Sequence, residues 1–82
     1  MYKVLLERKA QKRLSKIPSP YYEKIKSAIL ELAKNPIPFG HIKLTGRPAY
    51  RIRIADYRVI YEIHKDKLIV KVIDVGHRKE IY

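Results

Sequence analysis

The sequence contains no cysteine, few acidic residues and no long hydrophobic run. Without cysteine the chain can form no disulfide and no Cys-ligated zinc or iron–sulfur site, which fits a reducing cytoplasm. Its three histidines are scattered and predict no metal site. No apolar stretch approaches the roughly 18 residues of a membrane span, and no signal peptide is recognisable. We therefore expect a cytoplasmic protein with no membrane association, no metal and no cofactor.

The shortage of acidic residues leaves a large positive charge. Nineteen Lys and Arg residues stand against eight Asp and Glu, a net charge of +11. The 82 residues make one domain, which at this size buries only about 60 to 65% of its unfolded surface. An excess of one charge opposes compaction, so it indicates a polyanionic partner, with nucleic acid first. The alternative is a surface selected for solubility or heat tolerance.

The first half of the sequence predicts a strand followed by a helical hairpin. Residues 2–7 alternate loosely between apolar and polar, which predicts a short strand. Residues 8–17 place apolar side chains at helical spacing and end at a proline. Ser19 is the expected N-cap of a second helix, with Pro20 at its first position, and this helix should end by Asn35.

The second half contains three segments with strand-like alternation. They are residues 50–54, 57–63 and 67–75. The connections are short, and two-residue turns at Ala55-Asp56 and Lys65-Asp66 would give an antiparallel meander. The predicted fold is therefore α+β: a strand, a helical hairpin and a three-stranded antiparallel meander in one sheet.

This register assigns each side chain to a face of the sheet. The face that the helices cover should carry Tyr50, Ile52, Ile54, Tyr57, Val59, Tyr61, Ile63, Leu68, Val70 and Val72. The opposite face should carry Arg51, Arg53, Arg58 and Lys71, with Ile60, Ile69 and Ile73 beside them. These isoleucines would form a protein contact if they are exposed.

Arg53 should lie directly across from Arg58, and this pair is informative. Like charges on opposed strands destabilise a sheet by a few tenths of a kcal/mol up to about 1 kcal/mol. An anion between two guanidinium groups reverses that effect, because both can donate to its oxygens. The alternative is a solvated face whose long side chains splay apart. Four cations on one face favour a binding surface.

The C-terminal residues add further candidates at the arginine end of the sheet. His77, Arg78 and Tyr82 leave the predicted last strand there. Guanidinium groups, a phenol and an imidazole suit metal-free cleavage of RNA, whose own 2′-OH is the nucleophile. Nearby cations would lower the pKa of a tyrosine and make it a base. His77 is the rival base, since the ordinary pKa of histidine lies nearer neutrality.

The blocks YRIRIADYRVIYEI and VIDVGHRKEIY resemble the RelE family of type II toxins, in the RelE/ParE superfamily. The likeness covers nearly the whole chain. It implies a small α+β toxin that enters the ribosomal A site and cleaves mRNA, leaving a 2′,3′-cyclic phosphate and a 5′-OH. It also implies three partners: an acidic RelB-like antitoxin, the ribosome with its rRNA, and mRNA.

By motif, the resemblance implies three catalytic residues. Arg58 of DYR would stabilise the transition-state phosphate, Arg78 after GH would stabilise charge or donate a proton, and Tyr82 would be the general base. Four other residues are expected to contact the substrate: Arg51, Arg53, Lys71 and His77. Some relatives continue beyond this tyrosine. A terminal carboxylate beside Tyr82 would oppose the lowering of its pKa, so His77 stays an alternative base.

Two other functions remain open at this point. The ParE branch shares the fold but poisons DNA gyrase, and it lacks the ribonuclease residues. A non-catalytic RNA-binding module would need the basic face but not the tail. Substitution of Arg78 or Tyr82 separates a binder from an enzyme, because a binder would lose little more than one phosphate contact.

Overall fold

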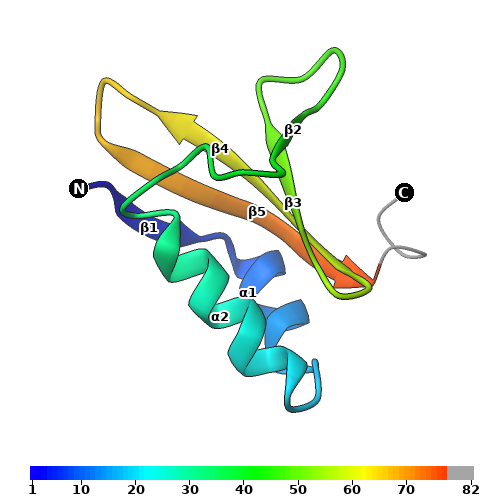
Figure 1. Ribbon diagram of the computed structural model, residues 1–82. Coiled ribbons are helices and arrows are strands. Elements are labelled where there is room, and N and C mark those ends of the chain that lie inside the picture. The colour runs from blue at the N-terminus through cyan, green and yellow to red at the C-terminus, as the bar shows by residue number, and fades with distance from the viewer. Residues whose placement is uncertain (78–82) are drawn as a thin grey trace.

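The computed structural model describes residues 1–77 and shows a helical pair packed on one face of a five-stranded sheet (Figure 1). The elements are β1 (Lys3–Leu6), α1 (Arg8–Ser15), α2 (Tyr21–Glu31), β2 (Ile42–Lys43), β3 (Tyr50–Ile54), β4 (Tyr57–His64) and β5 (Ile69–His77). The predicted α+β class and the order of strand, helical hairpin and meander are confirmed. Two predicted site residues, Arg78 and Tyr82, lie outside the described residues.

The strands have the spatial order β1-β5-β4-β3-β2. β1 runs parallel to β5, and every other neighbouring pair is antiparallel. The sheet is therefore mixed, and its first strand pairs with its last. β2 was not predicted, because two residues in a connection rich in Pro and Gly show no alternation. It pairs with the start of β3, where Ile42 is the partner of Arg51.

Both helices are shorter than the sequence predicted. α1 ends at Ser15 rather than at residue 17, because the next backbone N–H groups bond to carbonyls three residues earlier and tighten the last turn. α2 begins at Tyr21, with Pro20 in the N-cap position. The prediction of Ser19 as N-cap is wrong: its hydroxyl donates instead to Oε2 of Glu23, at 2.8 Å.

The connection between β4 and β5 also differs from the prediction. It contains the four residues 65–68 rather than two, and His64 pairs with Ile69. Leu68 was assigned to the covered face but lies exposed in this turn. A register shift between Ile60 and Tyr61 then leaves one extra residue on β5, a β-bulge. Beyond the bulge the alternation of β5 is reversed, so Val75 joins the core.

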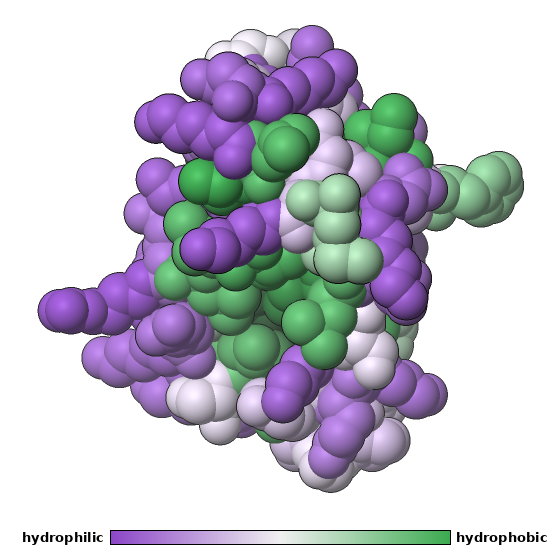
Figure 2. All heavy atoms as spheres, turned by 90° about the vertical axis from the view of Figure 1, so that its left-hand side faces the viewer, coloured by the Kyte–Doolittle hydropathy of each residue, from purple (hydrophilic) through white to green (hydrophobic). Residues whose placement is uncertain are grey.

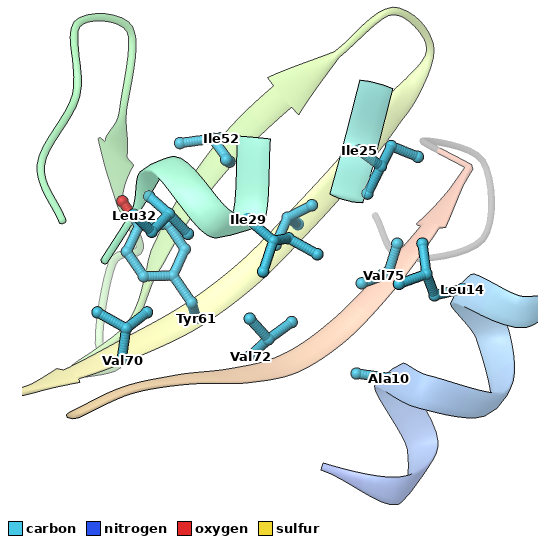
Figure 3. Close-up of a cluster of buried hydrophobic side chains, with 11 residues drawn as sticks. Ala10, Leu14, Ile25, Ile29, Leu32, Ile52, Tyr61, Val70, Val72 and Val75 are labelled. Carbon is cyan, nitrogen blue, oxygen red and sulfur yellow. The ribbon is translucent and has the colours of Figure 1, made fainter. Parts of the chain in front are cut away.

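Eleven buried apolar side chains form one core between the helices and the sheet (Figure 3). They are Ala10, Leu14, Ile25, Ile29, Leu32, Ile52, Val59, Tyr61, Val70, Val72 and Val75. Nine of the ten residues predicted for the covered face are buried in this cluster or pack against it, and the exception is Leu68. The hairpin part of the predicted face assignment is therefore confirmed.

An apolar groove opens between β1, α1 and α2. Val4, Leu6, Leu14 and Ile29 line it together with the exposed Leu30, and it has a volume of about 370 Å³. Figure 2 shows an apolar hollow, ringed by hydrophilic side chains, on the side of the molecule where β1 lies. No helix within residues 1–77 is long and apolar enough to cross a membrane.

Candidate functional site

An arginine pair lies at the end of the β3–β4 hairpin on the outer face, by which we mean the sheet face turned away from α1 and α2. Arg53 and Arg58 are register partners, as the sequence predicted. The two-residue turn at Ala55-Asp56 fixes this pairing. Nε of Arg53 donates to the carbonyl of Ala55 at 3.1 Å, which holds this side chain close to the turn. The fold thus places two arginines at directly opposed positions of the hairpin, an arrangement in which one phosphate can accept from both.

Arg51 lies next along the same face. Its register partners are Ile60 on β4 and Ile42 on β2. Ile60 was expected to be an exposed contact residue, and this is wrong, because it is only 3% exposed. Ile69 and Ile73 are half-buried. The apolar surface predicted beside the arginines is therefore much reduced, and charge dominates this end of the outer face.

Lys71 lies on the outer face but away from the arginine pair. Its register partner is Glu62, whereas the partner of Arg58 on β5 is Gly76. At about 3.3 Å per residue, the two positions on β5 are separated by roughly 15 Å. Oε1 of Glu62 also lies 3.0 Å from Nε2 of His64. Lys71 therefore belongs to a mixed-charge region further along the sheet.

His77 lies at the arginine end of the sheet but faces the helices. Its register partner is Tyr57, and the two rings are in edge-to-face contact with centroids 5.6 Å apart. Tyr57 in turn packs against the core and lies 5.5 Å from the ring of Tyr21. The sequence placed His77 at the correct end of the sheet. The sequence could not show on which face of the sheet His77 lies, because the bulge in β5 reverses the alternation of side chains.

A charge cluster that the sequence reasoning missed ties α1 to β5. Oδ2 of Asp74 lies 3.3 Å from Nζ of Lys9, and Oδ1 lies 3.5 Å from an Nη atom of Arg13. The carboxylate also accepts a hydrogen bond from the backbone N–H of Val75 at 2.9 Å. The spacing of Lys9 and Arg13, one helical turn apart, was the available signal. The cluster anchors α1 beside the point where β5 leads to the tail.

Tyr61 shows that a phenol in this fold can have a structural role. It is fully buried, and its hydroxyl donates to the carbonyl of Pro36 at 2.7 Å. Burial, with a smaller contribution from the neighbouring Tyr50, raises the pKa of Tyr61 to about 12. This side chain is therefore not a base. Within residues 1–77, no group of three or more His, Asp or Glu side chains could hold a metal ion.

Comparison with known proteins identifies the family. A sequence model described as the ParE toxin of the type II toxin–antitoxin system parDE matches residues 4–82. The mRNA interferase toxin RelE of Escherichia coli strain K12 is 32% identical over 81 residues, and the alignment covers 93% of this chain and 84% of that relative.

Solved structures agree with this match. A chain of the intact E. coli RelBE toxin–antitoxin complex superposes with a TM-score of 0.82 and 31% identity, covering 94% of this chain and 96% of that chain. A chain of the archaeal RelE–RelB complex from Pyrococcus horikoshii OT3 superposes with a TM-score of 0.83 and 30% identity, covering 94% of both. The chain belongs to the RelE/ParE superfamily of type II toxin–antitoxin toxins.

Proposed function

We propose that this protein is the toxin of a type II toxin–antitoxin pair and cleaves mRNA in the ribosomal A site, without a metal ion. The observation that carries the proposal is the Arg53–Arg58 pair, held side by side on the outer face. It supports an anion site in a chain that is 32% identical to an mRNA interferase. Like charges on opposed strands are unfavourable, and an anion bound between them reverses that effect.

In the proposed reaction the 2′-OH of the RNA attacks the adjacent phosphorus and the bond to the 5′-oxygen breaks. Arg58 stabilises the negative charge that develops on the phosphate oxygens. Arg51 and Arg53 bind neighbouring phosphates and hold the strand in line for attack. Lys71, further along the same face, binds the RNA backbone away from the cleaved bond.

Tyr82 accepts the proton of the 2′-OH, and Arg78 stabilises charge or donates a proton to the leaving oxygen. The position of His77 supports Tyr82 as the base. The imidazole of His77 packs edge-to-face on Tyr57, on the side of the sheet opposite to Arg58. From there it serves substrate binding rather than proton transfer at the phosphate held by the arginine pair.

An acidic RelB-like antitoxin neutralises the toxin. Solved relatives in complex with RelB antitoxins support this partner, and so does the net charge of +11. The apolar groove between β1, α1 and α2 fits the apolar face of an amphipathic antitoxin segment. Lys26 lies at the edge of this groove and Leu30 is exposed within it. Charge attraction steers the partner and apolar contact holds it.

A second candidate function is inhibition of DNA gyrase, as in the ParE branch. The description of the matching family model as a ParE toxin favours it. The identity to RelE relatives and the sequence blocks DYR and GHRKEIY favour mRNA cleavage instead. Cleavage of translated mRNA and inhibition of gyrase are separate assays, so both can be run on the same preparation.

Single-turnover cleavage on programmed ribosomes tests the proposed roles, because binding is then separated from chemistry. Arg58→Ala and Arg78→Ala should slow cleavage on the order of 100- to 1000-fold. Tyr82→Phe should slow it about 100- to 10,000-fold. Ribosome binding should change by only about a few fold, because each variant removes at most one phosphate contact.

Arg8→Ala is the matched control, since Arg8 is an exposed arginine on α1, away from the outer face. It should cleave at the wild-type rate. Wild-type cleavage by Tyr82→Phe together with inactivity of His77→Ala would identify His77 as the base. Normal cleavage by Arg58→Ala, Arg78→Ala and Tyr82→Phe alike would refute the roles assigned to these residues. RNA binding without any cleavage by the wild type would indicate a non-catalytic RNA-binding module.

A further inference from the structure

A cleft lies at the arginine end of the sheet, on the side of the helices rather than on the outer face. It is formed where α1, β4 and β5 come together and has a volume of about 360 Å³. Arg13 and Lys16 contribute from the end of α1, Tyr57 from the start of β4, and His77 from the end of β5. The roles proposed above leave most of these side chains unused.

The charge of this cleft is positive. Among residues 1–77, its lining includes two permanent cations, an imidazole and a phenol, and no carboxylate. The nearest ion pair is that of Arg13 with Asp74, whose single carboxylate is shared with Lys9. One negative charge thus faces two positive ones. The side chain of Arg13 is 35% exposed, although its Nη1 atom is buried, and Lys16 is exposed.

The cleft also has an aromatic wall. The rings of Tyr57 and His77 both line the cleft, with centroids 5.6 Å apart, and Tyr57 also contacts the ring of Tyr21 outside the cleft, at 5.5 Å. Tyr57 and Tyr21 are tilted at 43° and Tyr57 and His77 are nearly perpendicular, at 81°. Aromatic rings beside cations are the combination that binds single-stranded nucleic acid, because every base has a face that stacks and every nucleotide carries a phosphate.

We propose that this cleft binds one nucleotide of single-stranded RNA next to the position that is cleaved. Lys16 and Arg13 bind its phosphate, and its base stacks on Tyr57. The choice of RNA as ligand rests on the proposed function.

An RNA strand has only a short distance to cover between Arg58 and the cleft. Tyr57 and Arg58 are consecutive residues of β4 with side chains on opposite faces, and their register partners are His77 and Gly76. A strand held by Arg58 therefore reaches the cleft by passing around the end of the sheet. This places the cleaved phosphate at the edge between two binding surfaces and would restrain the nucleotides on both sides of it.

The test measures binding of a fluorescent RNA hexanucleotide with 2′-O-methyl groups, which lacks the nucleophile for cleavage, to the full chain at several salt concentrations. Lys16→Gln should weaken binding at least about 5-fold, since a charge-assisted contact is lost. It should also lower the slope of log K against log salt by about 0.7. Lys12→Gln is the control. It removes the same charge from the same helix, outside the cleft, and should have a clearly smaller effect on both quantities.

Substitutions of Tyr57 test the stacking. Tyr57→Phe keeps the ring and should bind as the wild type does, whereas Tyr57→Leu should weaken binding about 5-fold or more. Thermal unfolding must show that Tyr57→Leu is folded, because this side chain also packs against the core. If it does not fold, the comparison of Lys16→Gln with Lys12→Gln decides alone.

Equal weakening by Lys16→Gln and Lys12→Gln would overturn the proposal, because only net charge would matter. Wild-type binding by a folded Tyr57→Leu would overturn it too. It would also fall if Lys16→Gln impaired only the complex with an acidic antitoxin, since the cleft would then serve a protein. The outcome of this binding assay does not depend on whether the protein cleaves RNA. Specific loss of RNA binding in Lys16→Gln, without any cleavage on ribosomes, would uphold the cleft and refute the proposed function.

Discussion

Two tyrosines of β4 show how position on one strand decides what the same side chain does. Tyr57 and Tyr61 lie on the same covered face of β4, four residues apart and with Val59 between them. Tyr61 is central and fully buried, with its hydroxyl bound to the carbonyl of Pro36. Tyr57 lies at the strand end, half-buried, with its ring against Tyr21 and His77. Tyr61 therefore holds the connection after α2 on the sheet, whereas Tyr57 lines the cleft in which we propose that a nucleotide binds.

The raised pKa of Tyr61 predicts a loss of stability in alkaline solution. Its pKa is about 12 in the folded chain against an ordinary value of 10.0 for tyrosine. The stabilisation is complete below pH 10 and is lost as the pH rises towards 12, because the unfolded chain releases the proton first. Over that range the wild type should lose roughly 2 to 3 kcal/mol more than Tyr61→Phe. Urea unfolding at several pH values measures this difference.

At pH 8, Tyr61→Phe should itself cost about 1 kcal/mol, since the carbonyl of Pro36 loses its donor. The stability difference between the two proteins should therefore shrink and then change sign as the pH rises. Parallel pH profiles for wild type and Tyr61→Phe would contradict the assignment of the alkaline transition to this side chain.

At the scale of elements, the sequence was most informative where a turn left a single register. The hairpin of β3 and β4 was predicted with its pairing, and the Arg53–Arg58 pair followed from it. The connection between β4 and β5 was not predictable, because a shift of two residues leaves every side chain on its face. The bulge gave no signal either, since Ile73 and Val75 are both apolar and either could point to the core. That is why the end of the sheet was predicted for His77 but its face was not.

The hairpin turn carries strain that a substitution can remove. Ala55 has a φ of 55°, a conformation that glycine adopts without the steric cost of Cβ. Ala55→Gly should raise the free energy of unfolding by about 0.5 to 1 kcal/mol, despite the greater freedom of glycine in the unfolded chain. Urea denaturation of the wild type and of Ala55→Gly measures this difference in the free energy of unfolding.

The matched control is Ala28→Gly, in the interior of α2. There the same substitution should lower the free energy of unfolding by about 1 kcal/mol, because glycine is a poor helix former. A destabilised Ala55→Gly would show that the turn does not adopt the described conformation in solution.

For the whole molecule, charge is the dominant property, and it predicts a salt-sensitive interaction with the ribosome. Each phosphate neutralised on single-stranded RNA contributes about −0.7 to the slope of log K against log salt. Arg51→Ala and Arg53→Ala should each reduce that slope by about one such step, without changing where the mRNA is cut. Filter binding to programmed ribosomes between low and moderate salt measures the slope, with Arg8→Ala as control. A flat response would mean that the basic outer face is not the contact surface.

The groove of β1, α1 and α2 predicts how the toxin is neutralised. An acidic partner should co-purify with the protein from its native host. Leu30→Glu places a charge where an apolar segment is expected to dock, so affinity for that partner should fall at least about 10-fold. Leu68→Glu, an equally exposed leucine in the turn before β5, should bind normally. Equal effects of both variants, or the absence of any acidic partner, would contradict this surface. Cleavage by the free toxin should be unaffected in either variant.

The order of the strands has a consequence for folding during synthesis. Within residues 1–77, β5 is the last strand along the sequence, but it lies inside the sheet, between β1 and β4. Until residues 69–77 have emerged from the ribosome, β1 has no neighbour and the core lacks Val70, Val72 and Val75. The nascent chain can form the β3–β4 hairpin with its arginines, but not the folded body that carries them. Under the proposed function, the chain therefore completes the body that presents Arg53 and Arg58 only after residues 69–77 have left the ribosome that synthesises it.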